Sequence, residues 1–372
     1  MEILPNPYSN SLLVRRLGMS PEIGVFDLDH TLTGPKSAQV KAHALINARG
    51  PMIINTARET GMVMSSGALE ASRKYGYERA APHLGVDEET GKRTYARPER
   101  LDQYAGHLDP AAIIGFGGGV LLRQHDRGYA MDDSFSSLLG KDFRKRMRAH
   151  LEAIDFEGDL IAYLSPLEDE TAFVDGRTDV EPLYWRIQVN PKDEVHKTDL
   201  KFRIASYLLA IGEYAAVRIV DESRPGRPCF YIVPVMGTKE ASADHLLRHS
   251  LEEARVDIKS VNLTLADDAF TGLHMATDVL PGANGTFILP GKAPVARHLM
   301  PSSDVYGKPF VGEDVSWLLE RLEPTTQEGV YRCRMPGDMP DRRFVIADQA
   351  VPGLVAAESI LALDERGLIY PA

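Results

Sequence analysis

The stretch Ile23-Gly-Val-Phe-Asp-Leu-Asp-His-Thr-Leu-Thr33 decides the fold. Its apolar run is short and partly β-branched, which predicts a buried strand over 23–26. The strand ends in two carboxylates, Asp27 and Asp29, and then in residues that favour a turn. Because side chains fan out where a strand stops, both carboxylates can face one ligand, and a divalent cation relieves their repulsion. In an open α/β sheet, ligands bind at this carboxyl end of the strands.

The pattern Asp27-x-Asp29-x-Thr31 after an apolar strand resembles motif I of the haloacid dehalogenase (HAD) superfamily. The resemblance implies that Asp27 is a nucleophile toward a phosphoryl group and that Asp29 is a general acid and base. The alternative is an acidic, solvated turn after an ordinary strand. The remaining motifs of the superfamily must therefore follow in order along the chain.

The second strand is expected immediately after a helix at 37–48 that has Ser37 near its cap. Residues 51–58 contain a second apolar strand, which ends in the hydroxyl of Thr56. A helical stretch from 59 to 75 follows. A hydroxyl beside the free N–H groups of a helix start favours phosphate binding. This arrangement resembles HAD motif II, which implies that Thr56 binds the phosphoryl group. Arg58 matches an arginine that often follows this motif in sugar-phosphatase-like members, where it either contacts the phosphate or pairs with a surface acid.

The glycine-rich run at 111–122 indicates two strands joined by a turn. A dinucleotide-binding loop must open a helix, whereas Val120-Leu-Leu122 resumes an extended apolar run. We therefore expect the second of these strands to enter the next domain.

From 125 to 235 the pattern changes to helix, two strands, helix and two strands. The expected elements are a helix at 137–154, strands at 159–164 and 183–190, a helix at 193–212, and strands at 215–221 and 229–236. This order resembles the larger α/β cap that some HAD phosphatases insert between motifs II and III. Such a cap would close over the site and contact the leaving group, with Arg186 and Gln188, and also Lys201 and Arg203, as plausible contacts.

The run 230–247 resembles the strand, Gly-x-Lys and helix of HAD motif III. A lysine at a helix start is disfavoured by the helix dipole, which indicates that Lys239 serves as a fixed cation. The resemblance assigns this cation to the phosphate and to the Asp27 carboxylate.

The run 260–275 is an apolar strand that ends in Asp267 and Asp268 and resembles HAD motif IV. One of these two acids would complete the metal site. The run departs from the family twice: Ala266 replaces a usual glycine, and Thr271-Gly272 falls where a further aspartate often supports the metal ligand. The choice between the two acids therefore stays open at this point.

Length and composition agree with a globular protein of two domains. The chain has 372 residues, of which 44% are hydrophobic and 26% are charged. A net charge of −11 argues against nucleic-acid and anionic-membrane partners. The two cysteines, Cys229 and Cys333, are far apart, and residues 1–22 lack the apolar core of a signal peptide, so we expect a cytoplasmic protein.

Together the four motifs predict an α/β fold, with a Rossmann-like HAD core built on a parallel sheet and an inserted α+β cap. The predicted parts are a core at 1–124 and 236–323, a cap at 125–235 and a C-terminal extension of unknown role at 324–372. Within this extension we expect a strand at 342–347 and a helix at 354–365. The resemblance implies a Mg²⁺-dependent phosphatase that acts on a small phosphomonoester. The order of the motifs and the size and position of the cap most resemble the Cof-type, sucrose-phosphatase and trehalose-phosphatase group, which implies a sugar phosphate. Two alternatives remain open: a sugar phosphomutase, and a catalytically weak binding or regulatory protein. The sequence gives no indication of the oligomeric state.

Overall fold

The computed structural model describes residues 11–56, 85–86, 93–95, 110–115, 120–125, 128–132, 135, 143–154, 160–164, 185–189, 193–221, 229–293, 295–299 and 315–370. Arg58 and the helix expected at 59–75 lie outside these residues.

A large sheet organises the core, and within the described residues it has twelve strands in the order β14-β15-β16-β13-β12-β1-β2-β5-β6-β7-β4-β3. The six strands from β16 to β5 are all parallel, which confirms the predicted α/β class. These central strands are β1 (Glu22–Phe26), β2 (Met52–Asn55), β5 (Ala112–Gly115), β12 (Asn262–Ala266), β13 (Asn284–Leu289) and β16 (Arg342–Ile346). Antiparallel strands flank them: β6 (Val120–His125), β7 (Gly128–Met131), β4 (Arg93–Tyr95) and β3 (Gly85–Val86) on one side, β14 (Leu322–Pro324) and β15 (Val330–Cys333) on the other.

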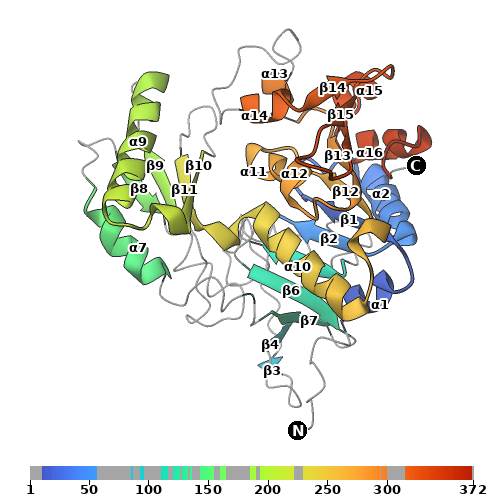
Figure 1. Ribbon diagram of the computed structural model, residues 1–372, viewed down its shortest axis with the longest axis horizontal. Coiled ribbons are helices and arrows are strands. Elements are labelled where there is room, and N and C mark those ends of the chain that lie inside the picture. The colour runs from blue at the N-terminus through green and yellow to red at the C-terminus, as the bar shows by residue number, and fades with distance from the viewer. Residues whose placement is uncertain are drawn as a thin grey trace.

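Strand β1 lies near the centre of this sheet, between β12 and β2, and residues 23–26 are buried. Ile23 and Val25 pack into the apolar cluster on one face, and Phe26 packs into the cluster on the other. Helices α1 (Leu12–Leu17) and α10 (Lys239–Ala254) cover the first face, and α2 (Lys36–Arg49) and α16 (Ala356–Glu365) cover the second (Figure 1). The strand therefore has the doubly covered environment that its near-continuous apolar sequence requires.

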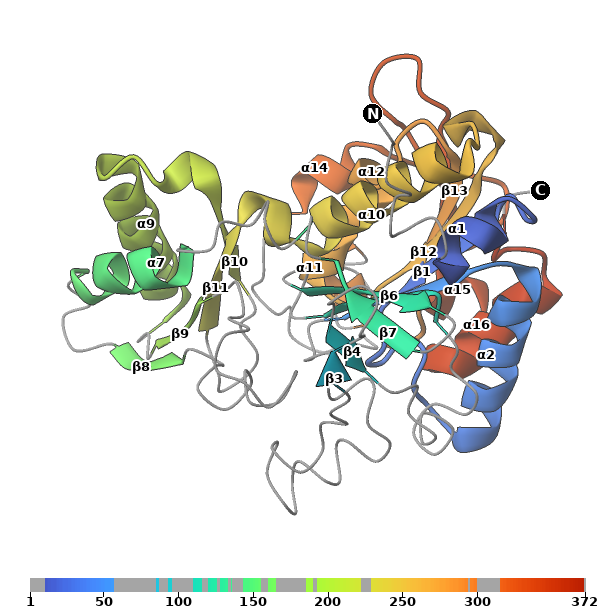
Figure 2. The same cartoon turned by 90° about the horizontal axis from the view of Figure 1, so that it is seen from below.

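A second, four-stranded antiparallel sheet forms a separate lobe, with the order β10-β11-β9-β8. Its elements follow the predicted order: α7 (Phe143–Glu152), β8 (Leu160–Leu164), β9 (Trp185–Val189), α9 (Glu194–Ala210), β10 (Val217–Asp221) and β11 (Cys229–Pro234). The lobe has its own apolar core, to which both helices and strands β10 and β11 contribute. Both views show α7 and α9 on the side of this sheet that faces away from the large sheet (Figures 1 and 2).

The structure corrects one expectation. Strand β6 does not lead into another domain, because it pairs antiparallel with β5 inside the large sheet, and β7 continues the same sheet. Helix α2 begins after its cap residue Pro35, so Ser37 lies near the cap, as expected.

The C-terminal residues belong to the core. Strand β16 pairs parallel with β13, and α16 packs beside α2, which gives a place to the strand and helix expected at 342–347 and 354–365. The remaining short helices are α11 (Phe270–Leu273), α12 (Met275–Asp278), α13 (Ala296–Leu299), α14 (Ser316–Leu319), α15 (Ala347–Ala350), η3 (Tyr214–Ala216), η4 (Val235–Gly237) and η5 (Ile258–Ser260). No helix in the described part of the chain is both long enough and apolar enough to cross a membrane.

Candidate active site

The candidate site lies at the carboxyl ends of three adjacent strands, β12, β1 and β2. The register pairs Phe26 of β1 with Ala266 of β12 and with Ile54 of β2, so the residues that follow these strands lie at one edge of the sheet. The backbone N–H of Asp27 donates to the Ala266 carbonyl at 2.8 Å. Asp27 and Asp267 therefore leave neighbouring strands side by side, as the two sequence motifs require.

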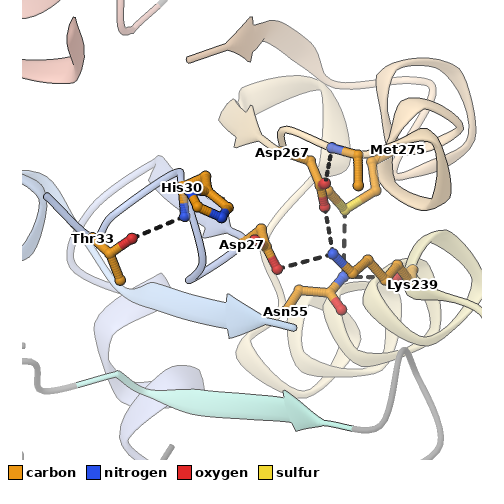
Figure 3. A network of polar contacts seen from close by, with 8 residues as sticks. Asp27, His30, Thr33, Asn55, Lys239, Asp267 and Met275 are labelled. Carbon is orange, nitrogen blue, oxygen red and sulfur yellow. Dashed lines mark hydrogen bonds and ion pairs between the residues drawn. The ribbon is translucent and has the colours of Figure 1, made fainter. Parts of the chain in front are cut away.

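Lys239 joins these two acids. Its Nζ atom donates to Asp27 Oδ1 at 2.9 Å and to Asp267 Oδ2 at 2.7 Å (Figure 3). All three side chains are almost completely buried. Lys239 is the first residue of α10, and the side chain of Thr238 caps that helix by accepting from the Ala241 N–H. The cap fixes the start of the helix, and thereby the direction from which the ammonium enters the site.

Asp267 is held on both of its oxygens. Oδ2 accepts from Lys239, and Oδ1 accepts from the backbone N–H of Ala269 at 2.9 Å. Gly272 of α11 packs directly against this carboxylate, where a Cβ atom would overlap it. These contacts hold Asp267 although the sequence lacks the further aspartate of the family at Thr271-Gly272.

Asp268 completes an acidic cluster. One oxygen from each of Asp27, Asp267 and Asp268 lies within 4.8 Å of the other two. Three carboxylates against one ammonium leave two negative charges when all are ionised, and one divalent cation would balance them. Hard oxygen donors are the ligands that Mg²⁺ prefers, so this set of residues fits that ion.

The electrostatics of the site show the cost of this crowding. Burial raises the pKa of Asp27 to about 7, and the charges of Asp267 and Asp29 add to the rise while Lys239 opposes it. Burial and the neighbouring carboxylates raise the pKa of Asp268 well above its usual value. The pKa of Lys239 is also raised, because its two carboxylate partners outweigh its burial, so the lysine stays charged.

Asp29 and Thr56 flank the cluster. Asp29 is partly exposed in the turn after β1, where its charge acts on both Asp27 and Asp268. The next residue, His30, has a left-handed backbone with φ 53°, and its N–H donates to Thr33 Oγ1 at 2.9 Å (Figure 3). Thr56 is buried immediately after β2, at the same edge of the sheet. Its N–H donates to the Ile114 carbonyl of β5.

The residues of the smaller lobe that are expected to contact substrate lie in two elements, β9 and α9. Arg186 and Gln188 lie in β9, with the same parity along the strand, and pair with Tyr231 and Cys229 of β11. Lys201 and Arg203 lie in α9, on the far side of that sheet from the core (Figure 2). Arg203 pairs with Asp199 at 3.1 Å.

Sequence reasoning missed Asn55. Its Nδ2 donates to the carbonyl of Lys239 at 2.9 Å and to Met275 Sδ at 3.3 Å, so it ties β2 to α10 and to α12 (Figure 3). The available signal was a polar amide within the buried run Met52-Ile-Ile-Asn55, where it must find partners.

No protein-family model matches this chain, and no curated protein matches it either. Among solved structures, it resembles the sucrose-phosphatase of Synechocystis sp. PCC6803 in complex with sucrose and phosphate. That match has 13% identity, a TM-score of 0.48, and covers 76% of this chain and 88% of that one. The C-terminal domain of C. albicans trehalose-6-phosphate phosphatase matches at 9% identity and a TM-score of 0.40, covering 71% of this chain and 76% of that one.

A haloacid dehalogenase-like hydrolase from Bacillus subtilis matches at 13% identity and a TM-score of 0.39, covering 75% of this chain and 85% of that one. The solved structures that resemble this chain thus include two phosphatases and a haloacid dehalogenase-like hydrolase.

Proposed function

We propose that this protein is a Mg²⁺-dependent phosphatase that hydrolyses a small phosphomonoester, and that its substrate is a sugar phosphate. The observation that carries the proposal is the Lys239 ammonium bonded to both Asp27 and Asp267, with Asp268 beside them. A fixed cation and a divalent-cation site next to a buried carboxylate make up a centre for phosphoryl transfer, where positioning and charge neutralisation supply most of the catalysis.

In this mechanism Asp27 is the nucleophile. Its carboxylate oxygen attacks phosphorus, the bond between phosphorus and the ester oxygen breaks, and Asp29 donates a proton to the departing alkoxide. Asp29 then removes a proton from a water molecule, which attacks the aspartyl-phosphate and releases inorganic phosphate. Asp27 is regenerated as a carboxylate, so protons and charges balance over the cycle.

The other residues hold the phosphoryl group. Lys239 offsets the negative charge between the phosphoryl oxygens and Asp27, and Thr56 donates its hydroxyl to an equatorial oxygen. Mg²⁺ held by Asp27, Asp29 and Asp267 or Asp268 would supply further charge neutralisation. Asp268 is the better candidate of the last two, because both Asp267 oxygens already accept hydrogen bonds.

The proposal of a sugar phosphate as substrate is supported by the smaller lobe. This lobe has the same order of elements as the larger α/β caps of some HAD phosphatases, which contact the leaving group. Arg186 and Gln188 of β9 stay proposed contacts, and Arg58 stays a proposed phosphate ligand. The second solved structure named above is a trehalose-6-phosphate phosphatase, which acts on a phosphorylated sugar as its name states.

The test is a panel of phosphate esters assayed with and without Mg²⁺, using Asp27→Asn as the variant. We expect phosphate release that needs Mg²⁺ and a loss of turnover by ~10³-fold or more in Asp27→Asn, because the amide is no nucleophile. Asp338→Asn, an exposed acid, is the matched control and should keep full activity.

Three outcomes would contradict the proposal. Turnover that persists in Asp27→Asn would reject the mechanism. An isomerised sugar phosphate without phosphate release would identify a phosphomutase instead. Tight binding of a phosphate ester with no Mg²⁺-dependent chemistry would identify a binding protein.

A further inference from the structure

Arg342 of β16 is a fully buried arginine that faces the segment after the acidic cluster. Its guanidinium donates to the carbonyls of Met275 (3.3 Å), Ala276 (2.9 Å), Val279 (2.5 Å) and Leu280 (2.6 Å). The first two carbonyls belong to the first two residues of α12, and the other two belong to the turn that follows the helix. One side chain therefore binds both this one-turn helix and the turn after it.

The charge of Arg342 suits this position. Backbone carbonyl oxygens carry partial negative charge, and Asp244 and Asp278 are close enough to act on the guanidinium. Burial lowers the pKa of Arg342 to about 10, which still leaves it charged at neutral pH. The neighbouring strand is also fitted to it, because a Cβ at Gly285 of β13 would lie 3.0 Å from Arg342 Nε.

The segment that Arg342 holds begins at the acidic cluster. Asp267 and Asp268 run directly into α11, then α12, and then the turn at Val279 and Leu280. The N–H of Leu280 donates to Asp244 Oδ1 of α10 at 2.8 Å, so the turn is held from both sides. Leu280 has a left-handed backbone with φ 41°, a conformation that persists only where the surroundings enforce it.

The same segment also contacts the site midway along its length. Met275 Sδ accepts from Asn55, whose amide also donates to the Lys239 carbonyl, and Gly272 packs against Asp267. A shift of α11 or α12 would therefore move the surroundings of Asp267 and Lys239 together.

We propose that Arg342 is a positioning residue for the metal site: by holding α12 and its turn, it fixes the backbone that presents Asp267 and Asp268. It supplies, from the C-terminal strand, the support that the sequence lacks at Thr271-Gly272. This inference rests on the proposed function, because it concerns the divalent cation of that site.

The test compares Arg342→Met with Arg343→Met. The two arginines are neighbours in β16, but Arg343 donates to the carbonyls of Gly367 and Tyr370, at 3.2 Å each, in the C-terminal segment. Mg²⁺ binding to each purified variant is measured by calorimetric titration without substrate, at a temperature at which circular dichroism shows every variant folded. Arg342→Met is expected to weaken Mg²⁺ binding by about 10- to 100-fold, the usual effect of losing a group that orients ligands. Arg343→Met should leave it unchanged within about twofold, whatever it does to the melting temperature.

Arg342→Lys keeps the positive charge but has fewer N–H donors. This variant tests the inference if Arg342→Met does not fold. A smaller loss of Mg²⁺ affinity in the same direction is expected for it. Unchanged affinity in Arg342→Lys, or equal losses in Arg342→Met and Arg343→Met, would overturn the inference while leaving the proposed function intact. A wild-type protein that binds no Mg²⁺ would instead overturn the proposed function, and the inference with it.

Discussion

At the scale of single residues, the molecule concentrates unfavourable charge at one point. Asp27, Asp267 and Asp268 are buried within reach of one another, and among the described residues the Lys239 ammonium forms ion pairs with Asp27 and Asp267. Like charges at such separations oppose folding unless a cation or protons neutralise them. Binding and stability are therefore coupled at this site.

This coupling predicts how the stability of the metal-free protein depends on pH. The folded-state pKa of Asp27 is about 7 against 3.8 for an ordinary carboxyl, so the folded state holds the extra proton between these values. The contribution of Asp27 is fully present below the lower pKa and is lost as pH rises through the upper one. The melting temperature without metal should thus fall as pH rises from about 5 to about 8, and saturating Mg²⁺ should reduce that fall.

Asp268→Asn tests which charge matters. Removing this carboxylate should raise the metal-free melting temperature at neutral pH and abolish the increase that Mg²⁺ gives the wild type. Asp338→Asn changes the net charge equally at an exposed position and should alter neither quantity. Equal behaviour of the two variants in thermal melts would contradict the coupling.

Much of the site was accessible from the sequence, because its acids and its lysine follow strands or begin a helix at recognisable places. Asn55, Met275 and Arg342 were not, since each acts through partners far away along the chain. In the sequence, Arg342 is a charged residue at the start of a strand, as is typical of an exposed edge strand. Its burial becomes evident only when β13 and α12 are placed beside it.

At the scale of elements, the last strands and α16 complete the core. Phe344 of β16 is fully buried and its ring lies 5.1 Å from that of Phe287 in β13. The sequence indicated a strand and a helix here, but strand order depends on contacts between distant segments, so the place of β16 beside β13 could not be foreseen. The same holds for β6, whose apolar residues suit either sheet.

Phe344→Ala measures how much this element contributes. Loss of a buried phenylalanine should lower the free energy of unfolding of the core by about 3–5 kcal/mol. Met339→Ala, in the exposed loop before β16, should change it by less than about 0.5 kcal/mol. Urea denaturation of both variants checks this, and similar small losses in the two would mean that the C-terminal strands are dispensable.

At the scale of the whole molecule, the two sheets have separate apolar cores. The smaller lobe packs Met147, Leu200, Ile204 and Phe230 into a cluster of its own. Its boundaries at 125 and 235 are still predictions. The order of its elements could be predicted from the sequence, because the hydrophobic pattern changes between helical and strand stretches. Separate cores allow one lobe to lose stability without the other.

Ile204→Ala should expose this independence. The truncation should increase hydrogen exchange in α7, α9 and β11, with a local cost of about 2–5 kcal/mol. Protection in β1, β12 and α10 should stay as in the wild type, and Mg²⁺ binding should not change. Faster exchange across both sheets, measured by mass spectrometry, would show instead that the lobes unfold together.

The strand order also has a consequence for biosynthesis. Strand β1 has β2 on one side and β12 on the other, and β12 leaves the ribosome only after the entire smaller lobe. The nascent chain must therefore carry strand β1 with one open edge through most of translation, a state prone to mispairing. Chaperone binding to ribosome-bound chains should consequently be strongest before residue 266 emerges, and decline once that edge is filled.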